Sequence, residues 1–168
     1  MVSEEKIYMW TKKFFLEYEW KPLGGDPPQG TDLPRLEISE PNTVHSLKKN
    51  KNSIINDLVF CKKSTILLIE CKDSEGKIES DIQKLRIFQE SKNWRESLVK
   101  SMEERSMFNR FSSDLDRQSI VDGTALVPVL AFSGQFRTSL ESFIQILYDE
   151  EGNQRFRVGK QVNHSGIP

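Results

Sequence analysis

Charged residues of both signs end one of the most apolar runs of the chain. The segment Ile66–Ile69 is followed by Glu70, Cys71 and Lys72. Successive side chains of a β-strand point to opposite faces, so Glu70 and Lys72 share one face and Cys71 points to the other. Charges at the edge of a buried strand are costly unless they are paired or bind a metal ion, which makes Glu70 and Lys72 candidates for a functional site.

A third charge, Asp57, comes within reach of Glu70 if the apolar runs around the two residues form an antiparallel hairpin. Pairing of Lys62 with Thr65 would place Asp57 directly across from Glu70, with the two side chains about 5 Å apart on one face. Two carboxylates at that distance repel each other, and the pKa of one of them rises unless a cation sits between them. A shift of the register by one residue would turn Asp57 to the opposite face.

These residues resemble the PD-(D/E)xK nuclease superfamily, which has the restriction-endonuclease-like fold. The resemblance rests on Asp57, a hairpin, the strand end Glu70-Cys-Lys72 and a following helix that contains Gln83. It departs from the family at Asn56, where the family name has proline. The fold class that it implies is α/β, with an αβββαβ core in which helices flank a mixed sheet.

The resemblance also implies a role for each residue. Asp57, Glu70 and the backbone carbonyl of Cys71 would hold Mg²⁺ or Mn²⁺, because these hard ions prefer oxygen ligands. Lys72 would orient or deprotonate the water that the metal activates, and Gln83 would support Lys72 or the phosphate. The implied protein is a Mg²⁺-dependent endonuclease that hydrolyses phosphodiester bonds, with DNA favoured over RNA. Cutting both strands of a duplex would usually require a homodimer.

Structural interpretations compete with these roles. Asp57, Glu70 and Lys72 could form only a salt-bridge cluster at a strand end, and Ser80 and Gln83 also fit a helix capping box. The alternative function is a non-catalytic domain that retains the nuclease fold and binds nucleic acid or another protein.

Families of this fold often add an acid from the first helix or from the segment before the hairpin. Glu17, Glu37 and Glu40 are the candidates for this additional acid, although each also fits an ordinary solvated residue. His45 could supply a further ligand or base, but a lone histidine in a polar segment is usually a surface residue.

A nucleic-acid substrate requires a positive surface near this site. Residues 43–72 contain six lysines and no arginine, and Asp57 and Glu70 are the only acids among them. Five of the lysines could contact phosphates, or could simply lie on a solvated loop and hairpin tip: Lys48, Lys49, Lys51, Lys62 and Lys63. The net charge of −1 excludes a uniformly cationic surface, so we expect contact through one basic face around a small acidic site.

The remaining sequence supplies the elements that position these residues, within a single domain over residues 1–168. Apolar spacing and turn residues predict the order of these elements. The first half is expected to contain a helix over 4–20 capped by Ser3, a Pro/Gly-rich loop over 21–34, a short strand over 33–38, a helical turn carrying Val44 and Leu47, and the hairpin over 57–71. The second half is expected to contain helices carrying Ile78 and Trp94, a strand over 125–132, and a last helix from a Thr138/Glu141 capping box to about Gly152. The basic segment that follows, with Arg155, Arg157 and Lys160, fits an edge strand or a phosphate contact.

The composition also indicates where the protein works. No stretch is long and apolar enough to span a bilayer, and acidic residues stand near the N-terminus where a signal peptide would be basic. We therefore expect a protein that is not secreted, has no membrane partner and acts in the cytoplasm or on the nucleoid. Cys61 and Cys71 fit a reducing compartment and are expected on opposite faces of the hairpin, without a disulfide or a zinc site.

Overall fold

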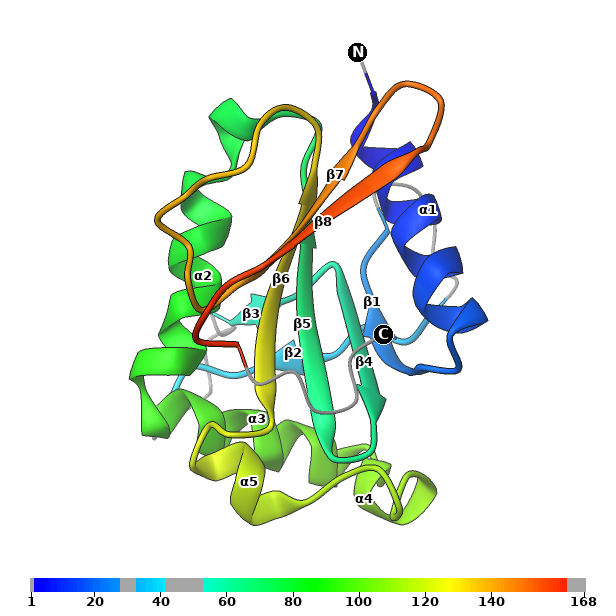
Figure 1. Cartoon of the computed structure of the whole chain (residues 1–168). Coiled ribbons are helices and arrows are strands. Elements are labelled where there is room, and N and C mark those ends of the chain that lie inside the picture. Colours follow the sequence, from blue (N-terminus) through cyan, green and yellow to red (C-terminus); the bar gives the residue numbers. More distant parts are fainter. Residues whose placement is uncertain (1, 28–32, 42–52, 163–168) are drawn as a thin grey trace.

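A mixed sheet of six strands forms the centre of the molecule in this computed structural model, which describes residues 2–27, 33–41 and 53–162. The outer pairs are antiparallel, and β5, β6 and β7 run parallel to one another. The strands follow in space as β1 (Lys21–Gly25), β4 (Leu58–Lys62), β5 (Thr65–Cys71), β6 (Leu126–Phe132), β7 (Ile144–Tyr148) and β8 (Gln154–Val158), as Figure 1 shows. A separate two-stranded sheet pairs β2 (Glu37–Ile38) with β3 (Ile54–Ile55).

Helices cover both faces of the six-stranded sheet (Figure 1). Alternate residues of β5 divide between two apolar cores, with Ile66 and Leu68 on the side of α2 and α3 and Leu67 and Ile69 on the side of α1. A strand that is buried on both faces is therefore apolar at nearly every position. The helical elements are α1 (Glu4–Glu17), η1 (Glu75–Lys77), α2 (Glu79–Glu90), α3 (Lys92–Glu104), α4 (Met107–Arg110) and α5 (Arg117–Val121).

The predicted hairpin and its register are confirmed. Lys62 pairs with Thr65 and Leu58 pairs with Ile69, so the two strands are aligned as the pairing argument requires. Lys63 and Ser64 form the turn with positive φ angles of 48° and 68°, the conformation of a tight two-residue hairpin turn.

The first helix and the two helices after the hairpin are also confirmed, with one difference at a cap. The Oγ atom of Ser3 accepts from the backbone N–H of Lys6 at 3.2 Å, which caps α1. The predicted capping box at Ser80 is wrong, because α2 begins at Glu79 and Ile78 occupies the N-cap position without a side-chain bond.

The Pro/Gly-rich segment is only partly a loop, and the prediction that it holds no regular element is wrong. Residues 21–25 form β1, which pairs antiparallel with β4 at the edge of the sheet. An edge strand tolerates Pro22, and the register shifts between Pro22 and Gly24. A Cβ atom at Gly24 would lie 2.9 Å from Cβ of Leu36, so glycine permits the following segment to cross close to the strand. Of the strand expected over 33–38, the last two residues form β2.

The predicted last helix is wrong, because its residues form β7. The apolar run from Phe143 to Tyr148 is buried on both faces, and Gly152 lies in the turn that leads into β8. Short apolar runs suit a buried strand and a helix equally, and pairing with β6 decides the outcome here. The basic segment that follows does form an edge strand, since β8 ends the sheet.

Strand β6 forms where the sequence predicts it, and it accommodates Pro128. The carbonyls of Ala125 and Ala131 accept from β5, so the odd-numbered residues of this strand face β5 and Pro128 faces the side of β7. Pairing with β7 begins only at Val129, and the missing N–H of Pro128 therefore leaves no ladder bond unmade.

Several expectations concern residues outside the described ranges. These are the helical turn with Val44 and Leu47, His45, and the lysines Lys48, Lys49 and Lys51. Among the described residues, no helix is long and apolar enough to cross a membrane.

Candidate functional site

Asp57 and Glu70 lie side by side at the open end of the hairpin. The backbone N–H of Asp57 donates to Oε2 of Glu70 at 3.1 Å, and the backbone N–H of Cys71 donates to Oδ2 of Asp57 at 2.8 Å. The two strands thus exchange backbone-to-carboxylate hydrogen bonds just beyond the last pair of the ladder. This bracing fixes the orientation of both carboxylates before any ligand binds.

Asn56, the residue at which the sequence departs from the family, belongs to the site. Its side chain is buried, and its Nδ2 atom donates to Oε2 of Glu70 at 2.9 Å. Its Oδ1 atom is buried and has no hydrogen-bond partner within the part of the chain that the structure describes. The sequence shows only that proline is missing here, whereas the structure shows an amide that orients a carboxylate.

The helix residue that reaches the site is Lys84 and not Gln83, which corrects the expectation for Gln83. Nζ of Lys84 lies 2.8 Å from Oε1 of Glu70 and 2.6 Å from the carbonyl oxygen of Ile55. Gln83 is exposed, because a helix advances by 100° per residue and turns position 83 away from the buried stripe of α2. The signal in the sequence is the spacing of Asp81 and Lys84, which puts both on one flank of that stripe.

Lys72 extends from the end of β5 toward two acids. Its Nζ atom lies 3.2 Å from Oε1 of Glu4 on α1 and 3.9 Å from Oδ2 of Asp81 on α2. Burial lowers the pKa of Lys72, but the nearby charges of Asp81 and Glu4 outweigh burial, and the pKa is raised above its usual value. Lys72 is therefore a cation that is held between two helices.

Glu4, on the first helix, is an acid that the structure places beside Lys72 and that the sequence did not suggest. Glu17 is exposed and lies 3.9 Å from Lys13 on the same helix. Glu37 accepts from Oγ of Ser53 at 2.7 Å, and Glu40 is half-buried shortly after β2. Sequence periodicity cannot show which turn of α1 crosses the end of β5, because that depends on how the helix packs on the sheet.

Burial sets the electrostatics of the carboxylates. Glu70 is 2% exposed, and burial raises its pKa, which the charge of Asp57 raises further. Burial likewise raises the pKa of Asp57 and of Asp81. Oδ2 of Asp81 is buried, has no hydrogen-bond partner among the described residues and lies 3.9 Å from the Lys72 ammonium. The site thus gathers three acids whose ionised forms burial disfavours, and a bound cation would stabilise those forms.

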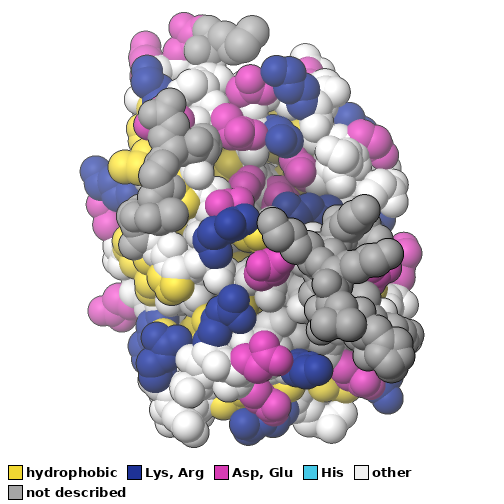
Figure 2. Space-filling view, turned by 180° about the vertical axis from the view of Figure 1, so that it is seen from behind, with side chains coloured by type: hydrophobic (Ala, Val, Ile, Leu, Met, Phe, Trp, Pro, Cys, Tyr) yellow, Lys and Arg dark blue, Asp and Glu magenta, His cyan; other side chains and the backbone are white. Residues whose placement is uncertain are grey.

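The described lysines of the hairpin lie far from this site. Lys62 donates to the carbonyl oxygen of Tyr18 at 2.8 Å, and Lys63 lies in the turn. The turn is separated from Glu70 by the length of β5, which is about 20 Å at 3.3 Å per residue. On the face shown in Figure 2, positive and negative side chains of the described residues intermingle and form no area of one sign.

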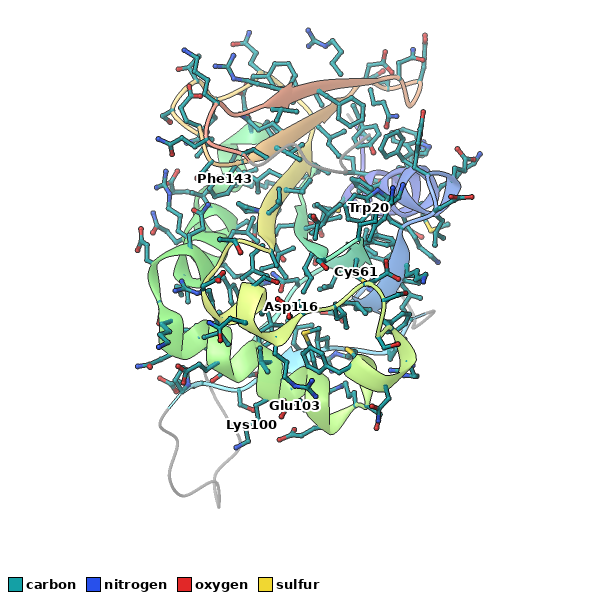
Figure 3. The ribbon with its side chains drawn as sticks, turned by 60° about the horizontal axis from the view of Figure 1, so that its bottom comes forward. Trp20, Cys61, Lys100, Glu103, Asp116 and Phe143 are labelled. Atoms are coloured by element: carbon teal, nitrogen blue, oxygen red, sulfur yellow. The ribbon has the colours of Figure 1, made fainter. Side chains whose placement is uncertain are left out.

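The two cysteines lie where the sequence predicts. Cys61, labelled in Figure 3, packs with the core on the side of α2 and α3, and Cys71 packs with the core on the side of α1. Both are buried free thiols, and they are separated by the sheet.

No family model matches the chain, and no curated protein or solved structure matches it either. The function therefore has to be inferred from the geometry and chemistry of the site. Asp57, Glu70 and the neighbouring backbone carbonyls form a set of oxygen donors of the kind that hard divalent ions prefer.

These oxygen atoms do not all point to one common position that a metal ion could occupy. Within the described ranges, no three Asp, Glu, His or Cys side chains form a group that could hold a metal ion. Lys84 occupies Oε1 of Glu70, and the backbone N–H of Cys71 occupies Oδ2 of Asp57. The donor set fits a hard cation in chemistry, and Oδ1 of Asn56, which is buried without a hydrogen-bond partner among the described residues, adds to that fit.

Proposed function

We propose that this protein is a metal-dependent nuclease of the restriction-endonuclease-like fold, which hydrolyses phosphodiester bonds with DNA as the favoured substrate. The observation that carries the proposal is the pair of hydrogen bonds that holds Asp57 against Glu70 at the end of the hairpin. Lys72 follows Glu70 by two residues and shares its face. Two fixed carboxylates beside a lysine are the groups that metal-assisted hydrolysis of a phosphodiester uses.

The order of elements supports the proposal. Helix α1 precedes three antiparallel strands, β1, β4 and β5, and α2 then leads to β6, which runs parallel to β5. With β2 and β3 paired in a separate sheet and α3, α4 and α5 lying between α2 and β6, this order is compatible with the αβββαβ core that the resemblance implies. The strand that completes the three-stranded meander is β1.

Asp57, Glu70 and the backbone carbonyl of Cys71 would hold Mg²⁺ or Mn²⁺. When bound, such an ion activates water and neutralises charge on the phosphate. In the metal-free protein the charges of Asp81 and Glu4 raise the pKa of Lys72. Beside a bound ion, Lys72 would orient or deprotonate the attacking water. Glu4 and Asp81 position the Lys72 ammonium from the two helices.

Cleavage assays with matched variants test the proposal. Wild type, Asp57→Asn, Lys72→Met and the control Lys100→Met are incubated with single-stranded, duplex and branched DNA and with RNA, in Mg²⁺, in Mn²⁺ and in EDTA. Lys100, labelled in Figure 3, is exposed on α3, and its variant should cut like wild type. Asp57→Asn and Lys72→Met should lose at least about 100-fold in rate. Equal cutting by all four proteins would reject the proposal.

A non-catalytic domain of the same fold is the second candidate. It is favoured by the absence, among the described residues, of three converging metal ligands. Calorimetric titration with Mn²⁺ separates the two candidates, since a domain that only binds nucleic acid or protein should show no affinity for Mn²⁺ that depends on Asp57.

A further inference from the structure

Strand β5 and helix α2 face each other with two crossed pairs of opposite charges. β5 presents Glu70 on the face toward α2, Lys72 follows directly after the end of the strand, and α2 presents Lys84 and Asp81 on one flank. Nζ of Lys84 lies 2.8 Å from Oε1 of Glu70, and Nζ of Lys72 lies 3.9 Å from Oδ2 of Asp81. Glu70 and Lys72 therefore each meet a residue of opposite sign on the helix.

The ammonium of Lys84 lies among oxygen atoms of the kind that bind metal ions. Its partners are a carboxylate oxygen of Glu70 and the backbone carbonyl oxygen of Ile55, at 2.8 and 2.6 Å. The Lys84 side chain is 27% exposed, so most of it is covered by the protein. Carboxylate and backbone carbonyl oxygens are also the protein ligands of hard divalent cations.

Glu70 has one carboxylate oxygen for this purpose. Oε2 already accepts from Nδ2 of Asn56 and from the backbone N–H of Asp57, at 2.9 and 3.1 Å. Oε1 is thus the oxygen that an ion would take, and it is the oxygen that Lys84 holds. Lys72 does not compete for it, because its ammonium pairs with Glu4 and Asp81.

We infer that Lys84 and a divalent ion compete for Oε1 of Glu70. This inference deepens the proposed function and depends on it. The ammonium and the ion repel each other at ligand distances, so they exclude one another from the same oxygen. Lys84 is an internal counter-ion that aligns the buried Glu70 carboxylate, and binding of the ion displaces the ammonium from Glu70.

Titration with Mn²⁺ alone, followed by calorimetry, tests the competition without any cleavage step. Lys84→Met and Lys84→Gln should bind Mn²⁺ about tenfold more tightly than wild type, because each removes the competing charge. Lys84→Arg keeps the charge and should bind no more tightly than wild type. The control Lys77→Met removes a lysine that pairs with Asp73 on the exposed surface, and it should leave the affinity unchanged.

The outcomes separate the inference from the proposed function. If wild type and Lys84→Met bind Mn²⁺ equally tightly and Asp57→Asn abolishes binding in both, the competition is refuted and the metal centre stands. If none of these proteins binds Mn²⁺, both the competition and the metal centre are refuted.

Thermal melting gives an independent readout and guards against a misfolded variant. Lys84→Met leaves Glu70 without its counter-ion, so its Tm in EDTA should fall below that of wild type. Lys84→Gln keeps a donor to both oxygens and should fold at least as well as Lys84→Met. Mn²⁺ should raise the Tm of either neutral variant by more than it raises the Tm of wild type, and an equal rise would contradict the competition.

Discussion

The backbone N–H of Asp57 donates a hydrogen bond to the carboxylate of Glu70. The main chain of Asp57 therefore holds Glu70 in place, while the side-chain carboxylate of Asp57 lies beside that of Glu70. This bond survives any change of the Asp57 side chain. The pair can therefore be altered one charge at a time without releasing Glu70 from the hairpin.

Asp57→Asn should stabilise the metal-free protein. Burial raises the pKa of the Asp57 carboxyl, which means that its ionised form is disfavoured in the folded state, and Asn keeps an oxygen that can accept from Cys71. We expect an increase of about 1 kcal/mol in the free energy of unfolding, measured in urea at pH 7.5 with EDTA. A loss of stability would show that the charge at Asp57 is already compensated by the protein.

Asp81→Asn should slow cleavage while leaving metal affinity nearly unchanged. Asp81 contacts Lys72 and not the proposed metal ligands, so its loss should leave the Lys72 ammonium held by Glu4 alone and lower the rate about tenfold. Rates in saturating Mn²⁺ and the calorimetric affinity for Mn²⁺ are the two measurements. Glu79→Gln, an exposed acid on the same helix that pairs with Arg137, is the matched control. A parallel fall of rate and affinity would assign Asp81 to the metal instead.

Asp114 makes a pH-dependent contribution to stability at the other end of the hairpin. Its carboxylate accepts from Nζ of Lys21 and from the backbone N–H of Lys63, and the hydrogen bond from Lys21 lowers its pKa. A lowered pKa stabilises the folded state above the unfolded value of about 3.9, and the stabilisation is lost as the pH falls through the folded pKa.

Asp114→Asn should accordingly destabilise the protein by about 2 kcal/mol at pH 7 and by much less at pH 3. Urea unfolding of both proteins at the two pH values gives the difference. The same penalty at both values would mean that hydrogen-bond geometry, and not charge, carries the contribution of Asp114.

Gln145→Leu should destabilise the protein at β7, the strand that the sequence predicts as a helix. The Gln145 side chain is fully buried in β7, and its amide accepts from and donates to the backbone of Arg137 at 2.8 Å each. Losing both bonds should cost about 2 kcal/mol in the free energy of unfolding. Gln118→Leu on exposed α5 provides the comparison and should change stability by less than about 0.5 kcal/mol.

The hairpin could be predicted because its signals are local, whereas the choice between two registers needed the structure. Apolar runs of strand length joined by a short polar link leave few registers, and only one puts Asp57 and Glu70 together. The companions of that pair could not be predicted in the same way. Glu4 meets Lys72 only because α1 crosses the end of β5, and the choice of Lys84 over Gln83 depends on which flank of α2 faces the strand.

The predictions for β1 and β7 are wrong for the same reason, which is pairing with a strand from another part of the sequence. Lys21–Gly25 contains proline and glycine and still forms a strand, because β4 offers it an edge to pair with. Ile144–Tyr148 has apolar residues at helical spacing and still forms a strand, because β6 lies beside it. In both cases the partner strand is distant in the sequence, beyond the reach of local propensity.

The parallel pairing of β5 with β6 has a consequence for when the site is complete. Residues 72–125 separate the two strands, and the backbone N–H of Lys72 donates to the carbonyl of Ala131 across this gap. During synthesis the hairpin and α2 leave the ribosome before β6. The backbone N–H of Lys72 can form its hydrogen bond to Ala131 only after β6 has emerged and paired with β5. A nascent chain that ends before Ala131 therefore carries its paired acids while the main chain at Lys72 is still unpaired, and the proposed site is complete only with the second half of the domain.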